Sequence, residues 1–279
     1  MYYKVLGKDN ADADTVVLSS GLGGSGSFWQ PQLPVLTQYF RVVIYDQHGT
    51  GLSQGTVPAG YRMEDMADEL AGMLNGLDIR RCHLVGHALG GIVGLHLALR
   101  YPALLQSLVV INGWATLDSQ TRRCFEVRQN LLLNSGVDAY VQAQPLFLYP
   151  GDWLSEHEAL LQEERQHQVA HFQGMENLLH RLQALMTSDL AASLDGVIAP
   201  TLALSCKDDL LVPWQRSADL AARLPLGEHQ QMQYGGHAMS VTDPDTFNPI
   251  LLDWLRRHAF HAADIVSEPF STEISWPKP

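Results

Sequence analysis

The stretch Gly86-His87-Ala88-Leu89-Gly90 decides the fold of this chain. It follows the apolar run 82–85 and precedes the run 91–99, which is periodic like a buried helix. A strand, a sharp turn and a helix with the spacing Gly-x-Ser-x-Gly form a nucleophile elbow, in which small residues let a strained turn lift one side chain above the sheet. Here the lifted residue is Ala88, and a methyl group cannot attack a substrate. The sequence therefore predicts a nucleophile elbow that lacks its nucleophile.

Length and composition bound the class of protein. The chain has 279 residues, of which 46% are hydrophobic, enough for one large α/β domain with an insertion or for two small domains. Its net charge of −12, without any basic run, argues against nucleic acid and anionic membranes as partners. We find no signal-peptide pattern and no apolar run of about 18 residues, the length that spans a membrane. We therefore expect a soluble, cytoplasmic protein.

Strand-like and helical patterns alternate over most of the chain. Strands are expected at 1–8, 15–20, 41–45, 82–85, 107–111, 201–205 and 231–234, and helices at 28–39, 63–77, 214–224 and 244–258. Continuous apolar strands alternating with helices are typical of βαβ units. The sequence thus predicts an α/β fold, with a mostly parallel twisted sheet covered by helices on both faces.

One segment interrupts this alternation. Residues 115–188 show helical patterns rich in Gln, Leu and His and no convincing strand, which predicts a helical lid inserted into the core domain. The core domain then consists of a first part at 1–114 and a second part at 189–258. Residues 259–279 show no period and are expected to form a C-terminal tail.

Two further motifs complete a candidate catalytic site. Asp208-Asp209 follows the strand at 201–205, and Gly235-Gly236-His237 follows the last strand. The order elbow, acid, histidine belongs to the α/β-hydrolases among the convergent catalytic triads. We expect Asp209 to accept a hydrogen bond from one ring nitrogen of His237, with Asp208 as the alternative acid.

The glycine-rich loop 21–27 supports two interpretations. Its pattern Gly-x-Gly-x-x-Gly, with Asp46 at the end of the next strand, matches a dinucleotide-binding fingerprint. Pro31 and Pro34 argue against this because they are poor inside the long helix that such a unit needs. In the other interpretation the loop supplies an oxyanion hole, with the backbone N–H groups of Leu22 and Leu89 as donors. We favour the oxyanion hole, since it alone explains the downstream motifs.

Several other side chains are candidates for a binding site. Trp114 directly follows a strand end, where α/β sites gather, and is expected to line the pocket. Arg122 and Arg123, near the start of the lid, are candidates for binding a substrate carboxylate, with ordinary surface as the equal alternative. His167 and His171 have the spacing of a metal-binding pair on a helix, but no third ligand is placed. No metal site is therefore predicted.

These motifs resemble the α/β-hydrolase superfamily over nearly the whole chain up to about residue 258. A closer resemblance, to the RutD hydrolases of the Rut pathway of pyrimidine degradation, lies at 20–27, 46–51, 86–90, 121–125, 142–150, 170–174, 208–213 and 234–238. It implies a cytoplasmic hydrolase of carbamate or aminoacrylate in uracil degradation, which needs no cofactor and whose family has alanine at the elbow. His48 departs from the superfamily, which more often has arginine at this position.

A site without a nucleophile still permits hydrolysis by general acid–base catalysis. His237, oriented by Asp209, is expected to activate water or protonate a leaving nitrogen of a small anionic substrate. Three alternatives stay open: a catalytically dead hydrolase that binds a ligand, an ordinary esterase whose serine was engineered to Ala88, and a dinucleotide enzyme. A homodimer is also left open.

Overall fold

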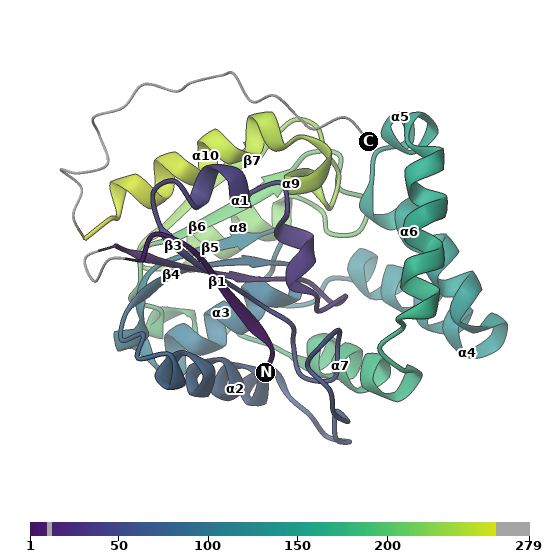
Figure 1. Cartoon of the computed structure of the whole chain (residues 1–279), viewed down its shortest axis with the longest axis horizontal. Coiled ribbons are helices and arrows are strands. Elements are labelled where there is room, and N and C mark those ends of the chain that lie inside the picture. The colour runs from purple at the N-terminus through teal and green to yellow at the C-terminus, as the bar shows by residue number, and fades with distance from the viewer. Residues whose placement is uncertain (10–12, 261–279) are drawn as a thin grey trace.

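A seven-stranded sheet forms the centre of the structure, a computed structural model that describes residues 1–9 and 13–260 (Figure 1). Within those residues the strands lie in the order β1-β3-β2-β4-β5-β6-β7, and only β1 runs antiparallel to its neighbour. The strands are β1 (Tyr3–Gly7), β2 (Thr15–Ser19), β3 (Arg41–Tyr45), β4 (Cys82–His87), β5 (Leu105–Ile111), β6 (Thr201–Cys206) and β7 (Gly227–Met232). The mostly parallel sheet confirms the predicted α/β-hydrolase fold class.

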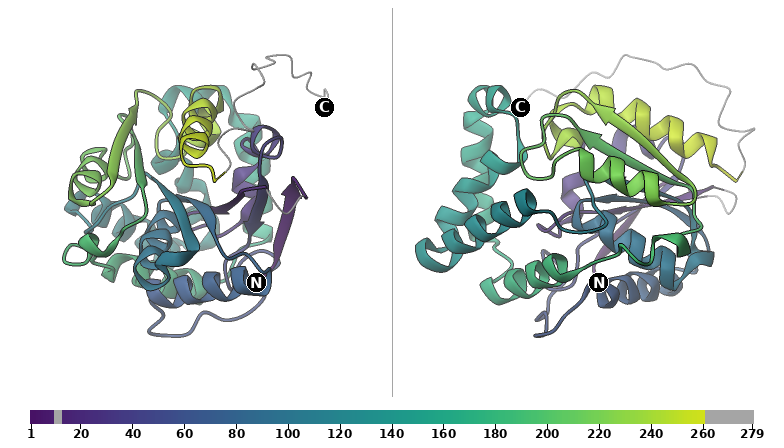
Figure 2. Two further views of the ribbon diagram at one scale, coloured as in Figure 1. Left: turned by 90° about the vertical axis from the view of Figure 1, so that its left-hand side faces the viewer. Right: turned by 180° about the vertical axis from the view of Figure 1, so that it is seen from behind.

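Helices connect the strands and cover both faces of the sheet. They are α1 (Leu33–Leu36), α2 (Met63–Gly76), α3 (Leu89–Arg100), α4 (Ser119–Leu148), α5 (Gly151–Glu156), α6 (Glu158–Ala170), α7 (Met175–Thr187), α8 (Gln215–Arg223), α9 (Met239–Thr242) and α10 (Pro244–Arg257), with short 3-10 turns η1 (Gly26–Trp29), η2 (Pro102–Leu104) and η3 (Leu194–Gly196). Figure 2 shows α2 and α3 on the opposite side of the sheet from α10.

Alternate side chains of the buried strands point into two hydrophobic cores. Val17 of β2 belongs to the core on the side of α2, α3 and α8, whereas its neighbours Val16 and Leu18 belong to the core on the side of α1 and α10. This is the alternation that a strand imposes when both of its faces are covered. It explains why the central strands are continuous apolar runs rather than alternating ones.

The segment between β5 and β6 lies at one end of the sheet. Its helices α4, α5 and α6 stand together beyond the strand ends (teal, on the right of Figure 1). The long α4 is broken at Gly136, whose φ of 87° and ψ of 179° are not helical. A small third core, made of Leu132, Tyr140, Val141 and Leu178, joins α4 to α7.

Two secondary-structure predictions need correction. The helix expected at 28–39 is instead η1 followed by the four-residue α1, because Pro31 and Pro34 interrupt the continuous hydrogen bonding of a longer helix. The strand expected at 231–234 begins earlier, at Gly227, and ends at Met232.

Of the tail expected at 259–279, residues 261–279 lie outside the described residues. In the described ranges, none of the helices has the length and apolarity required to cross a bilayer.

We predict opposite effects on stability for two glycine-to-alanine changes. An added Cβ at Gly90 would lie 2.2 Å from the carbonyl oxygen of Ser19, so Gly90→Ala should lower the free energy of unfolding by more than about 3 kcal/mol. Gly72 lies inside α2, and an added Cβ there would meet no atom within 4 Å. Gly72→Ala should therefore raise the free energy of unfolding by about 1 kcal/mol. Urea unfolding measures both; equal effects would show that the tight approach of α3 to β2 is wrong.

Candidate active site

The turn between β4 and α3 has the strained geometry of a nucleophile elbow. Ala88 has φ 47° and ψ −109°, a conformation that residues with a side chain rarely adopt, and its N–H donates to Ile111 O at 2.8 Å. Gly86 and Gly90 flank it, and a Cβ on Gly86 would lie 2.3 Å from Gly90 O. Backbone in such a region costs of the order of 1–3 kcal/mol. The elbow is thus present, with a methyl group at its tip.

His237 and Asp209 form a hydrogen-bonded pair next to this turn. His237 Nδ1 lies 2.7 Å from Asp209 Oδ2, and both residues are buried. Because a carboxylate only accepts, Nδ1 carries the proton and donates it. Nε2 then offers a lone pair, and within the described part of the chain it has no hydrogen-bond partner. This tautomer is the one in which histidine can act as a base.

Neighbouring strand ends fix the backbone of the histidine. His237 O accepts from His87 Nε2 at 2.8 Å and from Asn112 Nδ2 at 2.7 Å. Burial, with a smaller effect of His237, lowers the pKa of His87 to about 3, so His87 is neutral near pH 7. Its ring also stacks on Phe28, with 4.7 Å between the ring centroids. His87 is therefore a positioning residue that links the elbow to the histidine loop.

The two adjacent carboxylates after β6 have separate partners. Asp209 Oδ1 accepts from the N–H groups of Leu211 and Val212, at 2.8 and 2.9 Å, which turns its other oxygen to His237. Asp208 instead accepts from the N–H groups of the glycine turn 235–236, at 3.3 and 2.9 Å. Asp209 is thus the partner of the histidine, and Asp208 braces the loop that carries it.

The two candidate oxyanion donors lie beside the elbow. Leu22, in the loop after β2, and Leu89, the first residue of α3, line the same cavity as Ala88 and His237. Over residues 1–9 and 13–260, neither backbone N–H is engaged by a protein acceptor. Two backbone donors near an elbow residue can stabilise negative charge on a bound oxygen.

A buried arginine braces the loop that carries Leu22. Arg181, on α7, donates to the side-chain oxygen of Gln173 and to His48 O, and Gln173 Nε2 in turn donates to Leu22 O at 3.4 Å. Burial lowers the pKa of Arg181 to about 10, so its guanidinium stays charged near pH 7. The loop is thus connected to the helical segment beyond β5.

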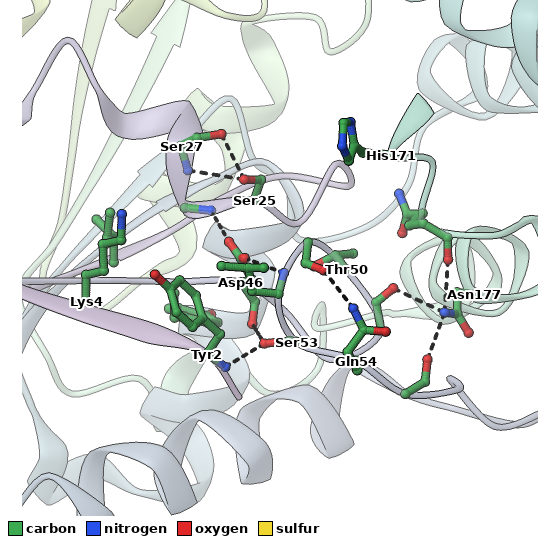
Figure 3. A pocket seen from close by; sticks show the side chains of 18 of the residues that line it. Tyr2, Lys4, Ser25, Ser27, Asp46, Thr50, Ser53, Gln54, His171 and Asn177 are labelled. Carbon is green, nitrogen blue, oxygen red and sulfur yellow. Dashed lines mark hydrogen bonds between the residues drawn. The ribbon is translucent and has the colours of Figure 1, made fainter. Parts of the chain in front are cut away.

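The dinucleotide interpretation of this loop disagrees with the structure. Asp46 Oδ1 accepts from Gly26 N and Oδ2 from Leu52 N, both at 2.9 Å, so the carboxylate ties two loops together (Figure 3). A dinucleotide-binding unit would need this carboxylate for a ribose and a long helix after the third glycine. Here η1 and the short α1 follow instead. Asp46 is therefore structural, beside a separate cavity of about 590 Å³.

The cavity above the elbow has a volume of about 1040 Å³. Trp114 lines it and is also buried against Phe125, with 6.2 Å between the ring centroids. Arg122 and Arg123, in contrast, are exposed on the outer side of α4 and do not line the cavity. The arginine of α4 that lines the cavity is Arg128.

Helical periodicity could have singled out Arg128. The buried residues Thr121, Cys124, Phe125, Arg128 and Leu132 of α4 recur at the spacing of one helix face. Arg122 and Arg123 fall between these positions, on the solvent side. The prediction that Arg122 and Arg123 bind a carboxylate rested on their charge alone. The period of the helix places both of them away from the inner face.

His167 of α6 and His171, which directly follows this helix, make local contacts. The rings of His167 and His171 lie 4.3 Å apart, and both residues line the cavity above the elbow. In the part of the chain that the structure describes, no three or more His, Cys, Asp or Glu side chains are grouped to bind a metal ion.

Comparison with known proteins agrees with this geometry. The family model for the alpha/beta hydrolase fold matches residues 14–134. A protein of Pantoea ananatis (strain LMG 20103) named "Putative carbamate hydrolase RutD" is 82% identical, covering 98% of this chain and 100% of its own length. A protein of the same name from Serratia proteamaculans (strain 568) is 64% identical, covering 91% of this chain and 96% of its own.

A solved structure gives the same fold at lower identity. The enol-lactonase from Burkholderia xenovorans LB400 superimposes with a TM-score of 0.82 at 25% identity, covering 91% of this chain and 95% of that chain. The strained elbow, the order of the motifs and relatives of this identity lead to one conclusion: the chain belongs to the RutD family of α/β-hydrolases.

Proposed function

We propose that the protein hydrolyses a small carbamate or aminoacrylate, with release of ammonia, in the degradation of uracil nitrogen. One observation carries this proposal: His237, hydrogen-bonded to the buried Asp209, lines a cavity together with a methyl group at the nucleophile position. The name of its relatives, carbamate hydrolase, supports the substrate class and cleavage of a carbon–nitrogen bond. The cytoplasm is the compartment that the family resemblance implies.

The chemistry proceeds without a covalent enzyme intermediate. For carbamate, water attacks the carboxyl carbon while His237 Nε2 takes one of its protons. The resulting imidazolium, stabilised by Asp209, then returns the proton to the nitrogen as the carbon–nitrogen bond breaks. Carbamate and water thus yield bicarbonate and ammonia. The methyl group of Ala88 leaves room for water where a serine would hold its hydroxyl.

The backbone donors supply the electrostatic part of catalysis. In the tetrahedral intermediate the former carboxyl oxygens carry more negative charge, which the N–H groups of Leu22 and Leu89 would stabilise. Leu89 N–H lies at the N-terminus of α3, where the helix dipole also favours an anion.

Aminoacrylate fits the same pair of residues. Water adds to the carbon that bears nitrogen after the enamine is protonated on its neighbouring carbon, and His237 assists loss of the amine as ammonia. Aminoacrylate and water then yield the corresponding aldehyde acid and ammonia. We also propose that the helical segment 115–188 acts as the lid of this site.

Loss of either member of the pair should lower the rate of ammonia release by about a hundredfold or more. We predict that His237→Gln and Asp209→Asn together cost little beyond the worse single change, because residues that act as a unit are not additive. The rates of ammonia release from carbamate and from aminoacrylate, corrected for spontaneous breakdown, measure the losses in the two single variants and in the double variant.

His229→Gln is the matched control. His229 is an exposed histidine bonded to Ser205, outside the cavity, and its replacement should leave turnover unchanged. Full activity in the His237→Gln variant would contradict the proposed role of His237, whereas absence of turnover in the wild type would favour a ligand-binding protein. Additive losses would show that His237 and Asp209 do not act together.

Ala88→Ser should create a reactive serine. The elbow geometry, two backbone donors and His237 already surround this position, so the new hydroxyl should become labelled by a fluorophosphonate probe. Native turnover should stay equal or fall, since the hydroxyl takes space assigned to water. Intact-mass spectrometry after exposure to the probe measures the labelling.

The wild-type protein is the control for this experiment and should remain unlabelled. Of the serines that line the cavity, Ser25 and Ser27 bond to each other, and the hydroxyl of Ser20 has no hydrogen-bond partner among the described residues, so none of the three is activated by a described histidine. Labelling of the wild type would show that the nucleophile lies elsewhere. A large gain of native activity in Ala88→Ser would indicate an ordinary serine hydrolase.

A further inference from the structure

A buried arginine of α4 faces the cavity above the elbow. Arg128 is 4% exposed and lines this cavity with Ala88 and His237. Three aromatic rings surround its guanidinium carbon, at 6.0 Å for Phe125, 5.4 Å for Tyr140 and 5.8 Å for Phe147. Aromatic faces stabilise a cation without neutralising its charge. The lining of the cavity thus includes a positive charge in a fixed place.

The hydrogen bonds of Arg128 use only part of its capacity. Nη2 donates to Tyr140 Oη at 3.0 Å and to Gln144 Oε1 at 2.8 Å, both neutral groups. A guanidinium has five N–H donors, so those of Nε and Nη1 remain, and no residue in 1–9 or 13–260 accepts from them. A buried charge with unused donors is costly unless a partner of opposite charge completes the site.

No carboxylate in the described part of the chain supplies that partner. Among the described residues, none of the ion pairs with a nitrogen–oxygen distance up to 4.0 Å includes Arg128. Three acids of α6 line the same cavity, namely Glu158, Glu163 and Glu164, but none of them pairs with it. Burial raises the pKa of Glu164.

The size of the cavity adds a second argument. About 1040 Å³ is the space that proteins use for drug-sized ligands, so shape alone cannot orient an anion of a few atoms. A charged group of fixed direction can orient it. Arginine suits this role because its planar donors match the two oxygens of a carboxylate.

We propose that Arg128 binds the carboxylate group of the substrate anion and selects for negative charge. Its neutral partners Tyr140 and Gln144 orient the guanidinium without cancelling its charge. This inference rests on the proposed function for the identity of the substrate, although carboxylate binding itself is measurable without turnover.

The other buried arginine shows the contrast. Arg181 donates to protein oxygens of Gln173 and His48 and does not line the cavity. Its hydrogen bonds connect two loops, which is a structural role. Arg128 also has a structural side, since Tyr140 and Gln144 lie beyond the break of α4 at Gly136. The experiment must therefore separate bracing of the helix from binding of an anion.

Propionate and propionamide are suitable probes, because they share one skeleton and differ in charge. Isothermal titration should show that the wild type binds propionate more tightly than propionamide. Arg128→Gln should raise the propionate Kd about tenfold or more, the effect of losing a charge-assisted hydrogen bond, and leave the propionamide Kd unchanged. Arg128→Lys keeps the charge and loses the planar donors, so its propionate Kd should lie between those of the wild type and Arg128→Gln.

Two controls test the structural explanation. Tyr140→Phe removes a hydrogen-bond partner of Arg128 but keeps the cation, and Arg122→Gln removes an exposed arginine of the same helix. Arg122→Gln should keep the propionate Kd within about twofold of the wild type. Tyr140→Phe, which loses one of the two bonds that orient the guanidinium, should raise this Kd by less than Arg128→Gln does, with thermal unfolding as a check on folding.

The proposal is overturned if Arg128→Gln binds propionate as the wild type does, or if the wild type does not prefer propionate. It is also overturned if Tyr140→Phe weakens binding as much as Arg128→Gln. If Arg128→Gln does not fold, Arg128→Lys decides: an unchanged preference for propionate over propionamide together with an unchanged Kd contradicts carboxylate recognition. Failure of ammonia release alone, with the preference intact, would contradict the proposed function and not this inference.

Discussion

The close approach of α3 to the end of β2 is the constraint on which the candidate site depends. Gly90 lies so near Ser19 that no side chain fits between them, and Gly86 is equally close to Gly90. This approach forces the chain to reverse within one residue, which gives Ala88 its unfavourable backbone angles. The turn persists although no nucleophile benefits from it. Its remaining roles are to place the start of α3, and with it the Leu89 N–H, beside the cavity.

Neutral hydrogen bonds give the site its precision. The backbone oxygen of His237 accepts from two side chains, His87 and Asn112, which come from the ends of β4 and β5. His87 can donate reliably because burial keeps its pKa far below neutral. The hydrogen bond from His237 Nδ1 to Asp209 is then added to a frame that is already fixed. Neutral hydrogen bonds thus hold the backbone of His237, and the carboxylate of Asp209 orients its ring.

The helical segment beyond β5 contributes to the site through two buried arginines with different surroundings. Arg181 connects loops through protein oxygens, whereas Arg128 faces the cavity with N–H donors from which none of the residues 1–9 and 13–260 accepts. A large cavity with a histidine at one place and a guanidinium at another can orient a small anion by charge where shape would not suffice. In the two proposals, this segment contributes to specificity and also covers the site.

The sequence by itself determined the fold class and the order of the motifs, because strands and helices follow local periods of apolar residues and the elbow needs small residues at fixed spacing. Pro31 and Pro34, which are poor residues inside a long helix, lie where the structure interrupts the helix expected at 28–39. The sequence favoured Asp209 over Asp208, and the tertiary structure supplied the reason, because the loop after β6 presents different N–H groups to the two carboxylates. Only the tertiary structure placed Arg128, and not Arg122 or Arg123, in the cavity, because the helical period groups side chains on one face but does not say what that face packs against.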